Sequence, residues 1–219
     1  MNFDALRKDI GRWGIARAMY ARVMPRLEAL LSFRIFVIHT RVLNTDAPLD
    51  TLPAGCSIGL IGQQELLAFA DDADLDLSSA FVMSACARGD LCFGYVERGK
   101  LVAYVWVGVG RTPAEAGLWV EFATGDAYSY AAFTRSSHRG RRLQQRLANC
   151  SDRWLTAHGH FHNIDYIQTH NIASIIADKG HGNHAIGYAG HLRWFGRTYC
   201  FHSSGVVARG FRFVLPPRC

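Results

Sequence analysis

The spacing of hydrophobic and polar positions changes several times along the chain, and each change marks a predicted element. Up to Leu31, apolar residues recur at helical spacing with arginines between them, which predicts an amphipathic basic helix or helix pair. Pro25 lies inside this stretch, and we expect it to separate two helices or to kink one. A strand is expected over Phe33–Leu43. The following stretch, Asn44–Gly55, contains Asp, Pro and Gly and is typical of a linker.

Beyond the linker, strand-like and helical patterns alternate. Helices are predicted over Gln63–Ala70, Leu77–Arg88, Arg141–Leu155 and Asn171–Asp178. Three hairpins are predicted, and single strands are expected at Ser57–Ile61, at Asn163–Thr169 and near Val206–Val214. The hairpins are Leu91–Glu97 with Leu101–Val109, Leu118–Thr124 with Ala127–Thr134, and Ala185–Phe195 with Arg197–His202. This order predicts an α/β (α+β) domain over residues 56–215, with a mixed, mostly antiparallel sheet flanked by helices and an N-terminal helical extension over residues 1–43.

Composition narrows the class of protein. The chain has 219 residues, of which 49% are hydrophobic and 19% charged, so it can bury one substantial core. No apolar run approaches the length of a membrane span, and no secretory or transit signal is recognised, so a cytoplasmic protein is expected. Six cysteines without a C-x-x-C pair are expected to be reduced thiols. A net charge of +6 favours anionic partners, and a phosphorylated cofactor satisfies it as well as nucleic acid does.

The segment Asp126–Cys150 carries the strongest chemical signal. A strand-like run meets a helix N-terminus near Ser137–Gly140. The first N–H groups of a helix have no partner within it, the helix dipole is positive there, and four arginines add charge. These are Arg139, Arg141, Arg142 and Arg146. The pattern predicts a phosphate or pyrophosphate cradle, and the alternative is a solvated basic helix face.

Two motifs, one in this segment and one further along the chain, resemble a known family. The run Phe133–Gln144 resembles the coenzyme A loop of the GNAT superfamily of acetyl-CoA-dependent N-acetyltransferases, whose pattern is Arg or Gln, two residues, Gly, one residue, then Gly or Ala. Arg139 matches the first position, but Arg142 and Gln144 stand where the glycines belong. Asn171-Ile-Ala-Ser174, followed by Lys179-Gly180-His181, is similar to a later segment of the family.

The resemblance implies a GNAT-like fold with acetyl-CoA as co-substrate. Backbone groups of Phe133 and Thr134 would pair with the pantetheine, and Asn171 and Ser174 would contribute to cofactor binding. The turn that would hold the pyrophosphate consists of Arg139, Gly140, Arg141, Arg142, Leu143 and Gln144. An amine would then attack the thioester directly, without a covalent enzyme intermediate.

The resemblance also implies a general base and a general acid. Glu121 is the one carboxylate set inside an apolar strand run, which makes it the first candidate for the base, although it can equally face outward from an edge strand. His170 is the next candidate. At the family position of an acidic Tyr this chain has Asp178, so the leaving thiolate is expected to take its proton from Tyr188 or from water.

No motif names the acceptor or the partners. A small-molecule or carbohydrate amine is expected, and the acidic run Asp71–Asp76 either faces a cationic substrate or is solvated surface. The alternatives are acylation of a sugar or lipid precursor for a surface polysaccharide, and a catalytically inactive GNAT fold that binds a nucleotide or nucleic acid. The N-terminal helix is expected to pack on its own domain or on a second copy in a homodimer. The other reading is peripheral contact with the anionic inner face of a membrane.

Three alternating histidines raise the question of a metal site. His158, His160 and His162 alternate, but they lie in a Gly-containing turn without zinc-finger spacing or a nearby carboxylate pair, so no bound metal is expected.

Overall fold

The computed structural model describes residues 3–46, 51–180 and 182–216. The helices are α1 (Phe3–Trp13), α2 (Ile15–Leu31), α3 (Gln63–Phe69), α4 (Ser79–Ala87), α5 (Leu143–Ala157), α6 (Ile172–Lys179) and α7 (Ser204–Ala208), with 3₁₀ turns at Glu115–Gly117 and Ser136–His138. The strands are β1 (Phe33–Val42), β2 (Cys56–Leu60), β3 (Leu91–Glu97), β4 (Lys100–Gly108), β5 (Thr112–Pro113), β6 (Trp119–Glu121), β7 (Asp126–Thr134), β8 (His162–Gln168), β9 (His184–Trp194), β10 (Arg197–His202) and β11 (Arg212–Val214).

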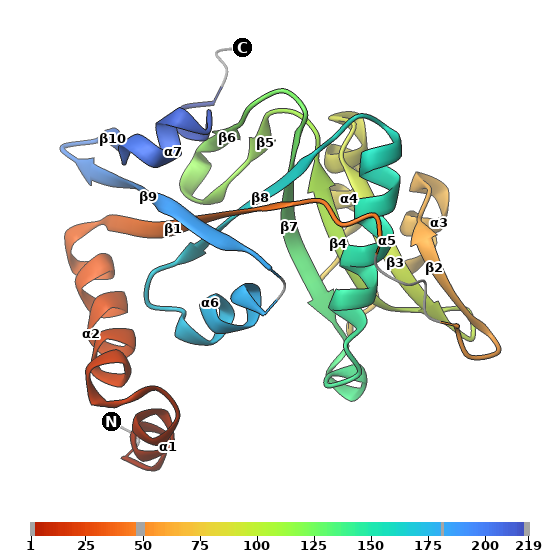
Figure 1. Cartoon of the computed structure of the whole chain (residues 1–219), viewed down its shortest axis with the longest axis horizontal. Coiled ribbons are helices and arrows are strands. Elements are labelled where there is room, and N and C mark those ends of the chain that lie inside the picture. The colour runs from red at the N-terminus through yellow and green to blue at the C-terminus, as the bar shows by residue number, and fades with distance from the viewer. Residues whose placement is uncertain (1–2, 47–50, 181, 217–219) are drawn as a thin grey trace.

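Eight of these strands form one sheet in the order β10-β9-β1-β8-β7-β4-β3-β2 (Figure 1). All neighbours are antiparallel except β7 and β8, which are parallel. A parallel pair needs a crossover connection, and α5 supplies it between these two strands. The predicted mixed, mostly antiparallel sheet flanked by helices is therefore confirmed.

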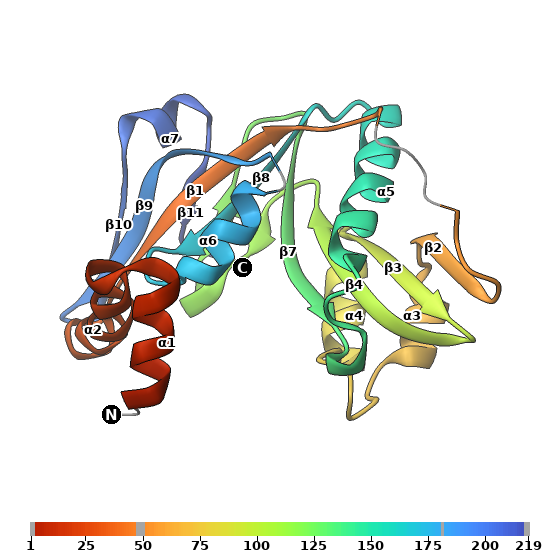
Figure 2. The ribbon, with the colours of Figure 1, turned by 60° about the horizontal axis from the view of Figure 1, so that its bottom comes forward.

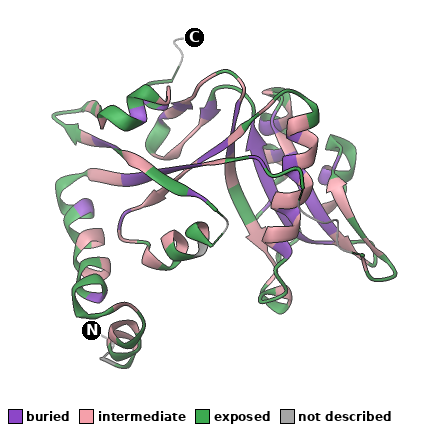
Figure 3. Cartoon of the chain, viewed as in Figure 1, coloured by how far each residue is buried: buried purple, intermediate pink, exposed green. Residues whose placement is uncertain are grey.

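Different helices cover the two faces of the sheet. Since alternate residues of a strand point to opposite faces, neighbouring residues of β4 contact different helices. Val105 and Val107 of β4 pack in a core cluster with Leu147 of α5, whereas Tyr104 and Trp106 pack with residues of α3 and α4. The same division is visible in Figure 2, and Figure 3 shows that the central strands are buried. The cofactor motif on α5 and the acidic α3–α4 connection thus lie on opposite faces.

One predicted hairpin is wrong. β6 does not pair with β7, because it joins β5 and β11 in a separate three-stranded sheet, whereas β7 pairs with β4 and β8. Gly125 has φ +87°, and the turn there redirects the chain into the large sheet instead of folding it back on β6. The predicted last strand is α7 followed by the short β11.

The N-terminal segment differs from the expected extension. The helix break falls at Gly14, where φ is +82°, and Pro25 lies inside α2. β1 is hydrogen-bonded to β8 on one side and to β9 on the other, so a boundary after Leu43 does not separate two structural units. α2 is also attached, because the Tyr20 hydroxyl donates to Thr169 Oγ1 at 2.7 Å. Within the described ranges, no helix is both long and apolar enough to cross a membrane.

Candidate active site

The two parallel strands in the middle of the sheet part after a short paired stretch. β7 and β8 pair only from Asp126–His162 to Tyr128–Ile164, and beyond that point no pairing joins them (Figure 2). A cavity of about 520 Å³ lies there, lined by β7, β8, α5 and α6. Parted parallel strands leave backbone groups open to a ligand, so this cavity is the candidate site for an extended molecule.

β7 carries a bulge at this cavity. Tyr104 pairs with Phe133 and Trp106 with Tyr130, so Ala131 and Ala132 both stand opposite one residue of β4. Ala131 has φ +45°, a strained value for a residue with a side chain. Both alanines also line a second cavity of about 460 Å³ towards α3 and α4. The bulge therefore adjoins both cavities, and bulges commonly re-aim groups beside active sites.

The predicted cradle forms the start of α5. This 15-residue helix begins at Leu143, and its N-cap residue Arg142 makes no side-chain cap hydrogen bond, so the first-turn N–H groups and the positive end of the dipole suit an anion. Arg139 and Arg142 are exposed beside it. Arg141 instead pairs with Glu97, Nη1 to Oε2 at 2.9 Å, and this contact lowers the pKa of that carboxyl group. Arg139 Nε donates to the Thr134 carbonyl at 3.4 Å, so the cradle keeps the terminal nitrogens of Arg139 and the side chain of Arg142 for a ligand.

The two positions that lack the family's glycines behave differently. Arg142 has φ +56° and ψ +29°, a left-handed conformation that glycine adopts without cost. Gln144 points its amide Nε2 at the Phe133 carbonyl at 2.7 Å, at Thr134 Oγ1 at 3.0 Å and at the Tyr104 carbonyl at 3.2 Å. It therefore occupies acceptors at the end of β7 that the resemblance assigned to the pantetheine.

The remaining predicted cofactor residues divide between the cavity, the core and the surface. Asn171 caps α6 by accepting from the Ser174 N–H at 3.2 Å, and Ser174 lines the larger cavity. Phe133 stacks on Tyr104 and lines the second cavity. Leu143 is buried in the core under α5. Only Gln144 and Ser174 of the predicted set line the larger cavity itself.

None of the three predicted acid–base residues lies at this cavity. Glu121 is in the small sheet, its side chain is 38% exposed, and it pairs with Arg111 at 2.8 Å. His170 faces α2, with Nδ1 3.3 Å from Glu28 Oε2. Tyr188 is exposed on β9. Glu121 is misplaced because its apolar strand belongs to a different sheet, which alternation alone does not reveal.

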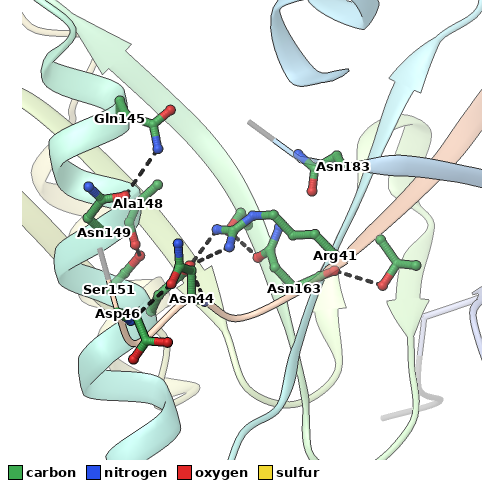
Figure 4. A network of polar contacts seen from close by, with 12 residues as sticks. Arg41, Asn44, Asp46, Gln145, Ala148, Asn149, Ser151, Asn163 and Asn183 are labelled. Atoms are coloured by element: carbon green, nitrogen blue, oxygen red, sulfur yellow. Dashed lines mark hydrogen bonds and ion pairs between the residues drawn. The ribbon is translucent and has the colours of Figure 1, made fainter. Parts of the chain in front are cut away.

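The structure adds polar residues along the cavity that the sequence did not single out (Figure 4). Arg41 at the end of β1 binds both carboxylate oxygens of Asp152 on α5, with Nη2 to Oδ1 at 2.8 Å, and the Asn44 N–H donates to Asp152 Oδ2 at 2.9 Å. Asn163 accepts from Ser129 on the neighbouring strand. Arg41 and Asp152 are 111 positions apart, and no local pattern joins them.

A second group at the cavity is acidic. His39 is completely buried, and its Nδ1 lies 3.1 Å from Asp178 Oδ2 and 3.6 Å from Asp165 Oδ1. The three facing atoms lie within 4.8 Å of one another. Burial, reinforced by the charge of Asp165, raises the pKa of Asp178 to about 7. Both carboxylates line the cavity, and only the mismatch at Asp178 with the family's Tyr pointed to this group.

Two of the alternating histidines have separate partners. His158 stacks on Trp154 at 3.6 Å, and His162 Nδ1 lies 3.3 Å from Asp126 Oδ1. Each of these two side chains therefore has a neighbour of its own.

Comparisons with known proteins give matches in structure only. No family model and no curated protein matches the sequence. The chain is similar to a solved Drosophila protein (15% identity, TM-score 0.50, covering 76% of this chain and 55% of that one). It is also similar to a GNAT-family acetyltransferase from Colwellia psychrerythraea (15%, 0.48, 84% and 57%) and to one from Novosphingobium aromaticivorans (18%, 0.46, 72% and 62%).

At these identities the likeness concerns the fold alone, and the chain spans somewhat more than half of each of these solved chains. The loop motif had predicted a GNAT-like fold. With its parted parallel strands, the bulge beside them and the helix that begins at their open end, the chain has a GNAT-like fold.

Proposed function

We propose that this protein transfers an acyl group, most simply acetyl, from acetyl-CoA to an amine. The observation that carries the proposal is the cavity between the parted strands β7 and β8, which the first turn of α5 lines through Gln144, with exposed Arg139 and Arg142 just before that helix. An extended cofactor with a pyrophosphate fits this combination, because open strand groups bind amides and a helix N-terminus binds phosphate.

The second cavity supports a cationic acceptor. Asp71, Asp72 and Asp76 line it, at the connection between α3 and α4. Asp72 is paired with Arg135 at 2.6 Å, and Asp71 holds Ser79, but the side chain of Asp76 is exposed. The acidic lining attracts an ammonium group, so a small, positively charged amine is the acceptor we favour.

The bulge would join the two halves of the reaction. An amine in the second cavity and a thioester in the larger one would meet at Ala131 and Ala132, which line both. An uncharged nitrogen of the acceptor attacks the thioester carbonyl while its ammonium group is held by the acidic lining. The carbonyl oxygen gains negative charge, and a backbone N–H aimed by the bulge would stabilise that charge.

Calorimetry with acetyl-CoA tests the first half of the proposal. Heat of binding, together with thiol release when 1,5-diaminopentane is added, is the expected result. A panel of neutral sugars serves as the comparison, because thiol release with these alone would favour acylation of a sugar precursor. Absence of any heat and of any thermal shift with acetyl-CoA would contradict the transferase.

Gln144 favours one competing function, a GNAT-like fold that binds a nucleotide without catalysis. Its amide already engages the Phe133 carbonyl, which narrows the strand edge available to a pantetheine. Adenosine 3′,5′-bisphosphate, which resembles the nucleotide end of CoA, distinguishes the two: equal affinity for it and for acetyl-CoA, with no thiol release, would support the binding protein.

A further inference from the structure

A buried imidazole and two carboxylates lie at the larger cavity. The proposed function assigns them no part in binding the phosphates or the acceptor. His39 comes from β1, Asp165 from β8 and Asp178 from α6, so three separate elements bring them together. His39 is fully buried, and Asp165 and Asp178 have side chains 16% and 11% exposed. Burial of two carboxylates side by side costs free energy, and such an arrangement is found where function requires it.

The atoms of this cluster that face one another lack hydrogen-bond partners. Asp165 Oδ1, Asp178 Oδ2 and both ring nitrogens of His39 have no well-aligned hydrogen-bond partner. The facing atoms are close enough to share a proton when they shift slightly. The other oxygen of Asp178 is held, because Asn183 donates its amide to Oδ1. Asn183 thus fixes the carboxyl group, while Oδ2 is left for the exchange of a proton.

We propose that Asp178 and Asp165 are the acid–base pair of the acyl transfer, and that His39 is their positioning residue. This inference rests on the proposed function. The carboxyl group of Asp178 gives its proton to the CoA sulfur as the carbon–sulfur bond breaks. The new carbon–nitrogen bond leaves a surplus proton on the amine nitrogen, and the carboxylate pair takes it up. One proton leaves and one returns, so the protein ends as it began.

The electrostatic surroundings agree with these roles. The groups that face Asp178 are Asp165 on β8, His39 on β1 and the amide of Asn183 before β9. Burial and the charge of Asp165 favour the protonated carboxyl, whereas His39 and Asn183 favour the carboxylate. With a pKa of about 7, Asp178 holds both forms near neutral pH, which suits a group that must give and regain a proton.

The same shift links the cluster to stability. The pKa of Asp178 is higher in the folded chain than the 3.8 of an ordinary Asp, so the folded state binds more protons between about pH 4 and 7. Its contribution to stability is fully present at low pH and is lost as pH rises through this window. Asp178→Asn removes the charge, and it is expected to raise the melting temperature at pH 8. If Asp178 had a purely structural role, the same substitution would lower the melting temperature.

The experiment compares Asp178→Asn with the unmutated full chain, using acetyl-CoA and 1,5-diaminopentane. The expected result is unchanged acetyl-CoA affinity, a fall in kcat of about 10²–10⁴-fold, and loss of the decline in rate above pH 7. Asp178→Glu should restore part of the rate. Asp9→Asn makes the same chemical change on α1 and should leave kcat and the pH profile as they are.

Each other outcome has a definite meaning. If Asp178→Asn keeps the rate and pH profile while the unmutated chain is active, the acid–base assignment is overturned and the transferase stands. If the unmutated chain neither binds acetyl-CoA nor releases thiol, the proposed function fails and takes the assignment with it. A rate that EDTA abolishes and a divalent cation restores would also overturn proton exchange as the role of this cluster.

Discussion

The two halves of the large sheet, on either side of the parting strands, are built in contrasting ways. The half with β2, β3, β4 and β7 comes from one stretch of chain, and its contribution to the site is the basic, exposed start of α5. The half with β8, β1, β9 and β10 takes its inner strand β1 from the N-terminus, and it contributes buried His39, Asp165 and Asp178. The first half offers binding charges, and the second offers groups that can exchange protons.

The largest effect we expect comes from removing β1. Deletion of residues 1–43 removes the strand that joins β8 to β9, so β8 keeps only its short pairing with β7 and β9 keeps only β10, and no cooperative unfolding transition should remain. Deletion of residues 1–31 removes α1 and α2 but keeps β1, and it should still unfold cooperatively at a lower temperature. Circular dichroism during heating measures both. A cooperative transition in the shorter chain would show that the two halves are independent.

The contact that joins the halves should have the next largest effect. Asp152→Asn on α5 leaves Arg41 of β1 without a charged partner, although Arg41 is only 11% exposed. Loss of one partner from a buried pair costs about 3–5 kcal/mol of unfolding free energy. Asp9→Asn breaks the more exposed pair with Arg22 and should cost at most about 1 kcal/mol. Urea unfolding measures the free energy of unfolding of both variants. Equal losses would show that the buried pair stabilises the fold no more than the exposed one.

The binding half is tested at the cradle. Arg139→Ala should weaken acetyl-CoA binding by about 1–3 kcal/mol, the range for a lost charge-assisted hydrogen bond, with little change in melting temperature. Arg111→Ala, on the side of the small sheet, is the matched control and should leave the affinity unchanged. Isothermal calorimetry at fixed salt measures both. An equal loss of affinity in the two variants would indicate a diffuse effect of positive charge.

The smallest effect concerns the backbone of the cradle. Arg142→Gly and Arg142→Ala both remove the guanidinium group, but only glycine accepts φ +56° without strain. The glycine variant should therefore be the more stable by about 1 kcal/mol in urea unfolding. The paired design cancels the loss of charge. If alanine is as stable as glycine, the left-handed start of α5 is relaxed in solution.

The contrast between the halves also explains what could be predicted from the sequence. Asn171 was recognisable as a helix start because its partner Ser174 is three residues away, and the cradle because its arginines are adjacent. The place of β1 in the sheet was not predictable, since alternation fixes the two sides of a strand but not its neighbours. The place of Glu121 in the small sheet, away from the larger cavity, was not predictable for the same reason. His39 and Asp178 come from elements far apart in the chain, and only the fold brings them together.

The position of β1 also affects how the chain folds while the ribosome synthesises it. The Thr40 hydroxyl of β1 donates to the Asn163 carbonyl of β8, a partner that is synthesised 123 residues later. At about 5–20 residues per second, β1 waits on the order of ten seconds before this partner emerges. During that time Phe36, Val37 and Ile38, which are buried in the finished sheet, belong to an unpaired strand. A nascent chain of this kind is open to aggregation, and chaperone capture of the first 43 residues would protect it.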